Sequence, residues 1–162
     1  ENDRDHLDRL AKAAGIRTAE DDSWADIFSR VIVEKVEPEL GFGRATILDE
    51  YPVSEAALAR RSPRDGRVAE RFELYGCGVE LANAFGELTD ADEQRRRFEI
   101  EMQEKSRIYG ETYPIDEELL AALTIMPPAS GIALGFDRLV MLATGAPRID
   151  LVMWAPVAAY GS

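Results

Sequence analysis

The chain of 162 residues carries nineteen basic and thirty-one acidic side chains, a formal net charge of −12 at pH 7, and 46% of its residues are hydrophobic. That hydrophobic fraction can build a core, which excludes an intrinsically disordered chain. The acidic balance argues against a protein whose main work is to grip nucleic-acid phosphates, because that work needs a basic face. No apolar run approaches the roughly 20 residues of a membrane helix, so we predict no membrane partner.

Cysteine and histidine are almost absent from the sequence. The one cysteine, Cys77, cannot form an internal disulfide, and together with the one histidine, His6, it cannot build a zinc site of the usual Cys/His kind. We therefore expect a cytoplasmic protein in a reducing environment. The chain opens at Glu1 without a Met or a charged-then-apolar leader, so we expect no signal peptide and interpret the chain as a piece of a longer protein.

Residues 1–44 are predicted to be helical. Asn2 or Asp3 can cap a first helix that stops at Gly15, and Ser23 can begin a second one. Apolar side chains at helical spacing are expected to pack the two helices. We interpret this segment as a packing element that precedes a sheet or is inserted in it.

The remaining residues, 45–162, are predicted to contain the sheet. Glycines in the sequence Gly76-Cys77-Gly78 supply the positive φ angles that a tight hairpin needs. Because consecutive strands form this hairpin and helices lie elsewhere, the sequence predicts the α+β class with an antiparallel sheet. The expected strands cover residues 45–48, 68–75, 79–85 and 130–135.

Four helices are expected between and after these strands. Thr89 or Asp90 caps the longest, which is polar on most faces and ends before Gly110. The last helix is apolar nearly all round, which predicts that it is buried. The three other than the longest cover residues 54–60, 116–123 and 136–144.

Two carboxylates, Glu73 and Glu80, lie seven positions apart on either side of the hairpin turn. Antiparallel pairing can set them across from each other at about 5 Å between Cβ atoms. Two acids in a sheet interior repel unless a cation lies between them, and Mg²⁺ bound with substrate phosphates meets that need. The alternative is a solvated face on which Glu73 pairs with Arg71 or Arg97, and the spacing does not decide between the two.

Asn83 and Glu87 follow in the same strand segment. Strict alternation places Glu80 and Asn83 on opposite faces. If both serve one site, a β-bulge must lie near Ala82 or Ala84. The small residues in this segment leave room for a ligand beside the backbone.

Small residues recur at every second position of the strand at 130–135, which leaves one face bare for a flat ligand. A helix start, a natural site for anions, follows it. Arg138 is the only cation in this otherwise apolar helix, and a ligand phosphate would be a suitable partner for it. The alternative is a structural ion pair with Asp137 or Asp150.

Taken in order, these three elements resemble the C-terminal half of the catalytic domain of a class II aminoacyl-tRNA synthetase. The stretch from Gly131 to Arg138 resembles the third signature motif of that class, and the stretches 71–73 and 80–88 resemble the lysyl-specific subgroup. The closest likeness is to its shortened, GenX-type paralogues, which ligate β-lysine to elongation factor P. The resemblance covers roughly residues 45 to 152.

This resemblance implies an ATP-dependent ligase that activates lysine or β-lysine as an aminoacyl adenylate, with elongation factor P as acceptor and tRNA less favoured. It implies ATP and Mg²⁺ as cofactors and a homodimeric full-length protein. Position by position, the metal would be held by Glu73 and Glu80, the amino acid by Glu80, Asn83, Glu87 and Ala133, and ATP by Glu73, Leu74, Gly131, Gly135 and Arg138. Arg138 would be the catalytic residue, holding the γ-phosphate.

Two departures refine this expectation. Synthetases proper usually have glycine where this chain has Ala133, and an added methyl is worth on the order of 1–3 kcal/mol in a pocket, so the resemblance favours the paralogue. The first and second class motifs, which supply the dimer interface and the α-phosphate arginine, are not found. We therefore expect the chain alone to be inactive. A genuine lysyl-tRNA synthetase fragment and a non-catalytic synthetase-like binding module remain the alternatives.

Overall fold

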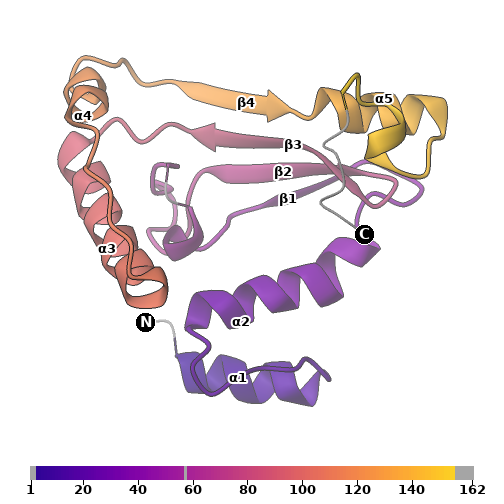
Figure 1. Ribbon diagram of the computed structural model, residues 1–162, viewed down its shortest axis with the longest axis horizontal. Helices are drawn as coiled ribbons and strands as arrows, with labels where there is room; N and C mark the ends of the chain where they lie inside the picture. Colours follow the sequence, from indigo (N-terminus) through magenta and orange to yellow (C-terminus); the bar gives the residue numbers. More distant parts are fainter. Residues whose placement is uncertain (1–2, 57, 156–162) are drawn as a thin grey trace. The chain divides into compact units, whose positions relative to one another are not determined.

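The computed structural model describes residues 3–56 and 58–155 (Figure 1). The chain divides into two compact units that alternate along the sequence. Unit 1 draws its described residues from Glu1–Leu48, Glu73–Ala82 and Leu134–Ser162, and unit 2 from Asp49–Phe72 and Asn83–Ala133. From the sequence, a helical segment was expected to end at residue 44. This boundary stays a prediction, because the compact units are groups of residues in contact and do not test where that segment ends.

Four strands form one antiparallel sheet in the order β1-β2-β3-β4 (Figure 1). The α+β class is therefore confirmed. The second strand begins three residues later than predicted, because the Arg71 amide donates to the Ala69 carbonyl at 2.9 Å and bends the chain there. The strands are β1 (Thr46–Asp49), β2 (Arg71–Gly76), β3 (Val79–Gly86) and β4 (Ser130–Leu134).

The hairpin between β2 and β3 forms as predicted. Cys77 and Gly78 both have positive φ, 53° and 75°, as a two-residue type I′ turn requires. Glycine at position 78 is also needed for space, since a Cβ there would stand 2.8 Å from the Phe42 ring.

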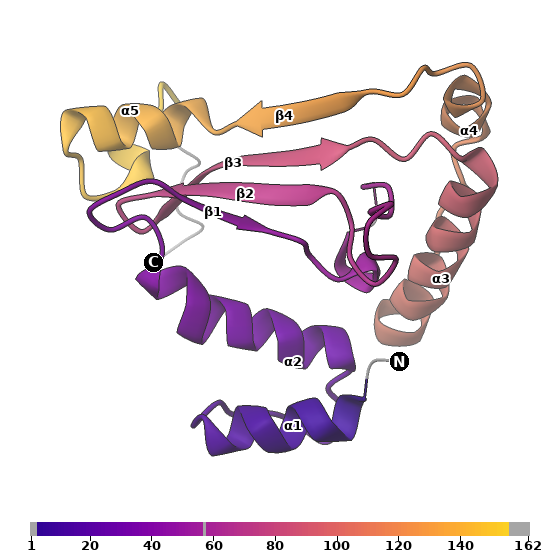
Figure 2. The same ribbon diagram turned by 180° about the vertical axis from the view of Figure 1, so that it is seen from behind.

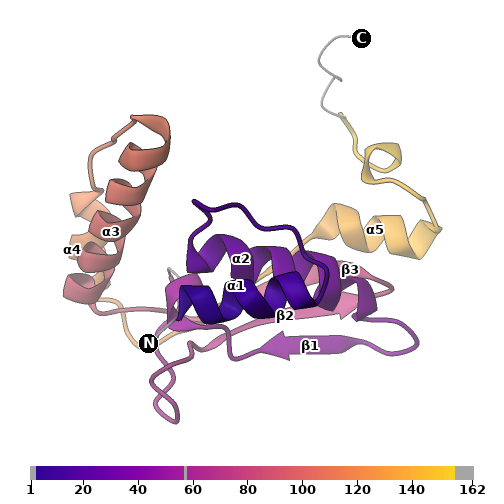
Figure 3. The same cartoon turned by 90° about the horizontal axis from the view of Figure 1, so that it is seen from below.

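In unit 1, α1 (Arg4–Ala13) and α2 (Trp24–Val31) pack side by side (Figures 2 and 3). Asp3 caps α1, and Ser23 forms a reciprocal capping box with Asp26 at the start of α2. Their shared core consists of Ala11, Ile16 and Ile27. The predicted pair of packing helices is confirmed, and α2 continues through a π turn (Ile32–Val36) and a 3₁₀ turn (Glu37–Glu39).

The last helix, α5 (Phe136–Thr144), has the predicted bounds but not the predicted burial. None of its residues is buried, and Phe136 is 69% exposed. An all-round apolar pattern shows that a helix suits an apolar environment, but it does not show which part of a protein provides it. A short 3₁₀ turn, Ile149–Leu151, follows this helix.

In unit 2, α3 (Ala91–Tyr109) packs against α4 (Glu117–Leu123), as Figure 2 shows. Asp90 rather than Thr89 caps α3, and Gly110 ends it with a left-handed φ of 68°. None of the helices within the described ranges is both long and apolar enough to cross a membrane.

The helix predicted at 54–60 is wrong. The described residues there form only a 3₁₀ turn, Val53–Glu55, and Ala59 then pairs in antiparallel fashion with Glu87. The Arg97 guanidinium donates to the Ala59 carbonyl at 2.9 Å, which ties this segment to α3. Sheet pairing and an arginine from a distant helix thus override a weak local helical pattern.

Candidate functional site

The hairpin places Glu73 and Glu80 as diagonal rather than direct neighbours. A two-residue turn pairs Gly76 with Val79, so Glu73 lies opposite Ala82 and Glu80 lies opposite Tyr75. The expected direct pairing across the strands is therefore wrong by one step, although both carboxylates keep to one face of this part of the sheet. Both belong to unit 1.

Glu73 is buried, with 6% of its surface exposed. The Tyr75 hydroxyl donates a hydrogen bond to its Oε2 at 2.7 Å. A buried carboxylate needs such donors because losing water costs free energy. Leu74, between these two residues in β2, is half-buried.

Glu80 forms an ion pair with Arg138, at 2.8 Å between Oε2 and the guanidinium. The same guanidinium nitrogen donates to the Glu80 carbonyl at 3.0 Å. Arg138 therefore does pair with an acid of the protein, as the alternative considered from the sequence had it, but that acid is Glu80 and neither of the two named examples. Asp150 pairs instead with Arg148, which lowers the pKa of Asp150. Arg138 is also not a buried cation, because 44% of its side chain is exposed.

Gly135 caps the N-terminus of α5 and lies against Arg138. A Cβ at position 135 would stand 3.2 Å from Arg138 Cδ, which is tighter than an ordinary contact. Glycine at this position therefore lets the arginine side chain fold back across the start of the helix.

The end of β3 contacts the chain just before β2. The Gly86 amide donates to the Glu70 carbonyl at 2.7 Å, at the bend that precedes Arg71. The β-bulge near Ala82 or Ala84, which a shared site for Glu80 and Asn83 requires, stays a prediction.

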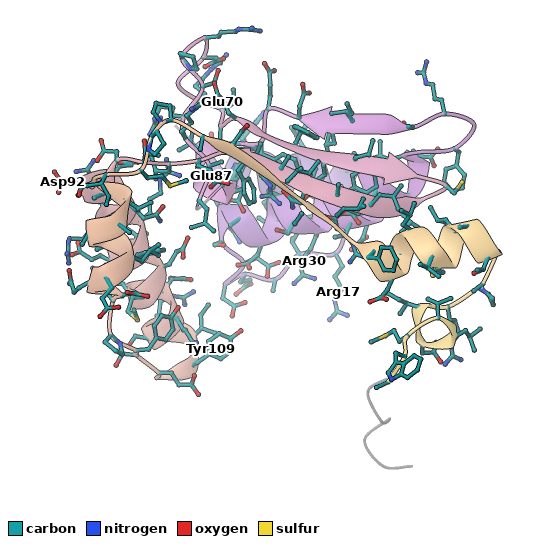
Figure 4. All side chains as sticks on the ribbon, turned by 90° about the horizontal axis from the view of Figure 1, so that it is seen from above. Arg17, Arg30, Glu70, Glu87, Asp92 and Tyr109 are labelled. Atoms are coloured by element: carbon teal, nitrogen blue, oxygen red, sulfur yellow. The ribbon has the colours of Figure 1, made fainter. Side chains whose placement is uncertain are left out.

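Glu87 follows β3 in unit 2, and its backbone is held from both sides. Its amide donates to the Ala129 carbonyl at 3.0 Å, and it forms an antiparallel bridge with Ala59. Its side chain is half-buried, yet the carboxylate has no hydrogen-bond or ion-pair partner among residues 3–56 and 58–155. Figure 4 shows Glu87 near the first residues of β4. A half-buried, unpaired charge is unfavourable and suits a cationic ligand.

The carboxylate of Glu87 lies directly over Gly131. A Cβ at position 131 would stand 2.6 Å from Glu87 Oε1. Gly131 is half-buried, whereas Ala133 on the same strand is exposed, and Asn83 on β3 is half-buried. The predicted amino-acid residues Asn83, Glu87 and Ala133 thus fall within unit 2, while Glu80 falls within unit 1.

Unit 2 also contains a cavity of about 580 Å³ that the sequence did not predict. Gly131 lines it, and so does the ion pair of Arg60 with Glu70, which lies over Gly86. Arg64 has no side-chain partner among the described residues. The only sequence signal was the density of arginines at residues 60–67, a stretch that otherwise reads as an exposed loop. Other lining residues are Asp49, Glu50, Arg71, Phe72, Phe85 and Ile132.

The donor chemistry of unit 1 suits a hard cation. The part of the chain that the structure describes holds no group of three or more potential metal ligands. Two carboxylates are nevertheless enough for Mg²⁺ when substrate phosphates and water complete its six oxygen ligands. Glu73 and Glu80 supply only oxygen donors, and the carboxylate of Glu80 is at present balanced by Arg138.

Comparison with known families decides the classification. A family model described as class II tRNA synthetases (D, K and N) matches residues 28–158. The chain belongs to this class II tRNA synthetase family. The resemblance to class II synthetases is therefore confirmed, and family membership agrees with the α+β sheet.

Individual relatives of this synthetase-family chain share one name. Elongation factor P–(R)-β-lysine ligase of Proteus mirabilis is 51% identical over 128 residues, which cover 78% of this chain and 39% of that protein. Ligases of the same name from Haemophilus influenzae and Sodalis glossinidius are 43% and 47% identical over 93% and 90% of this chain. The chain spans 47% and 44% of those two proteins, so it covers less than half the length of these curated relatives.

Proposed function

We propose that the full-length protein is an ATP-dependent ligase that activates (R)-β-lysine and transfers it to a lysine of elongation factor P. Its relatives are named as ligases of (R)-β-lysine and elongation factor P, and they are similar to this chain over 78–93% of its length. The observation that carries the proposal is the unpaired carboxylate of Glu87. A half-buried negative charge on a fixed backbone is suited to the distal ammonium of a lysine-like substrate.

The residues of unit 1 provide the charges for a nucleotide. Arg138 would hold the γ-phosphate, and this would require it to leave Glu80 for a phosphate oxygen. Glu73 and the released Glu80 would then hold Mg²⁺. The ion would offset charge on the phosphates and on the leaving pyrophosphate. Leu74 and Gly135 would contact the nucleotide.

The chemistry needs no covalent nucleophile from the protein. A carboxylate oxygen of β-lysine attacks the α-phosphorus of ATP, the bond to the pyrophosphate oxygen breaks, and an acyl adenylate forms. The acceptor amine then attacks the acyl carbon and releases AMP. The protein residues bind and orient the reactants and stabilise developing charge.

The cellular setting follows from the same proposal. A protein acceptor suits the net charge of −12 better than broad contact with tRNA phosphates does. We further propose a cytoplasmic location and a homodimeric full-length protein. We expect the 162-residue chain assayed alone to form adenylate slowly, because no arginine in the sequence context of the second class motif is found in it.

The test is amino-acid-dependent exchange of pyrophosphate into ATP by the purified full-length protein. We expect exchange with (R)-β-lysine to exceed exchange with α-lysine, and mass spectrometry to show one added β-lysyl group on elongation factor P. Efficient lysylation of tRNA without modification of the protein would instead establish a lysyl-tRNA synthetase. Failure to bind ATP, Mg²⁺ or any lysine isomer in calorimetry would leave a non-catalytic module.

A further inference from the structure

The missing side chain of Gly131 matters for the position of the Glu87 carboxylate and not for the backbone conformation at residue 131. Gly131 does not have a positive φ, so its conformation is open to other residues. What glycine provides here is space, because a Cβ would stand 2.6 Å from Glu87 Oε1 and 3.8 Å from Glu87 Cδ. The shorter distance is too close for two heavy atoms that are not bonded to each other, so alanine at 131 must displace the carboxylate.

The displacement would fall on the side chain of Glu87 alone. The Glu87 backbone is held by Ala129 and by the bridge to Ala59. The contacted oxygen, by contrast, is the far end of a flexible side chain without a partner among the described residues. The carboxylate can therefore turn away at little cost to the fold, so a methyl group at 131 moves a charge without removing it.

We propose that Gly131 is the positioning residue for Glu87: its missing side chain lets the carboxylate lie against the start of β4, where it receives the distal ammonium of the substrate. The proposal deepens the proposed function and rests on it. It gives Gly131 a role in amino-acid recognition, whereas the family resemblance places this glycine in the floor of the adenosine site.

The first experiment compares Gly131→Ala with the wild-type full-length protein in pyrophosphate exchange. We expect the KM for (R)-β-lysine to rise about 10-fold, as for a misplaced charged contact, while the KM for ATP stays unchanged. The melting temperature should stay within about 2 °C, because no buried contact of the core is lost. Gly66→Ala is the matched control, since a Cβ there meets only Arg61 Cδ at 3.6 Å.

A double-mutant cycle with Glu87→Asp separates positioning from a general structural effect. Aspartate is one methylene shorter, so its carboxylate does not reach over position 131. Glu87→Asp alone should raise the KM for β-lysine, and Gly131→Ala should add little in that background. The two substitutions should therefore be clearly non-additive, which is the signature of side chains that act through each other.

Three outcomes with the variants would overturn the inference and leave the proposed function standing. A rise in the KM for ATP alone would return Gly131 to the adenosine site. Additive effects in the cycle would show that the two residues act independently, and an unchanged KM for β-lysine in Gly131→Ala would show that the carboxylate needs no such clearance. Absence of any lysine-dependent exchange by the wild-type protein would instead overturn the proposed function and this inference with it.

Discussion

Near each end of β4, a glycine lies beside a charged side chain. The two charged side chains differ in whether another side chain of the protein balances the charge. In unit 1, Gly135 lies against Arg138, whose charge is balanced by Glu80 at 2.8 Å. In unit 2, Gly131 lies under Glu87, whose carboxylate has no partner among the residues that the structure describes. The balanced pair must exchange a partner to bind a ligand, whereas the unbalanced carboxylate can bind a cation directly.

The largest effect is expected from removing the unbalanced charge. Glu87→Gln keeps the shape of the side chain but loses its charge, so kcat/KM for (R)-β-lysine should fall about 100-fold, as for loss of one partner of a desolvated ion pair. The KM for ATP should not rise and the melting temperature should not fall, because the substitution removes no interaction of Glu87 with another described residue. Glu118→Gln, on the exposed face of α4, is the control, and an equal loss there would contradict a specific role for Glu87.

A somewhat smaller effect is expected from the balanced pair. Arg138→Ala should raise the KM for ATP about 30-fold, as for loss of a charge-assisted phosphate contact, and leave the KM for β-lysine near its wild-type value. Arg148→Ala is the matched control, because that arginine is 74% exposed and pairs with Asp150. A shift in the KM for β-lysine instead would place Arg138 on the amino-acid side of the reaction.

Substrate choice should change through a residue without charge. Ala133→Gly removes the methyl that departs from the synthetase pattern, and kcat/KM for α-lysine should rise about 10-fold, within the range for one methyl group in a pocket. Pyrophosphate exchange with the two isomers measures the ratio. An unchanged preference would separate Ala133 from isomer selection.

The smallest effect is expected from Glu93, a carboxylate whose ion pairs stabilise the fold and take no part in the proposed site. Hydrogen bonds from Arg96 and Arg97 hold the pKa of Glu93 below its usual value. A lowered pKa means that Glu93 stabilises the fold above the unfolded pKa of about 4.3, and that this contribution is lost as the pH falls through the folded pKa. Glu93→Gln should therefore lower the free energy of unfolding by about 1 kcal/mol at pH 7.

Urea denaturation at several pH values checks this, and the deficit should begin to shrink below the usual glutamate pKa of about 4.3 and close as the pH falls through the lower folded pKa. The same series on Glu87→Gln should show no loss of stability at pH 7. If both variants were destabilised equally, the contrast between a structural and a functional carboxylate would fail.

Local patterns predicted much of the fold and part of the candidate site. The hairpin glycines, the caps at Asp3 and Ser23 and the bounds of α5 all depend on neighbouring residues, and the sequence indicates them directly. The segment 54–60 could not be read in this way, because its conformation is set by pairing with Glu87 and by Arg97 of a distant helix.

The partners of the site residues were equally hidden from the sequence. Spacing predicted that Arg138 needs an acid, but the candidates near it in sequence were wrong, and the structure gives Glu80, fifty-eight positions away. Similarly, nothing local indicated that Gly131 clears space for Glu87, since that contact joins the end of β3 to the start of β4. Long-range pairing decides both, and it depends on the register of the whole sheet.

The central claim is that Glu87 recognises the distal ammonium, and one measurement tests it most directly. Wild-type and Glu87→Gln full-length proteins are compared in pyrophosphate exchange with (R)-β-lysine and with (R)-3-aminohexanoic acid, which lacks only the distal amine. We predict that the wild-type protein strongly prefers β-lysine and that this preference collapses toward unity in Glu87→Gln. A preference that survives the substitution unchanged would contradict the claim.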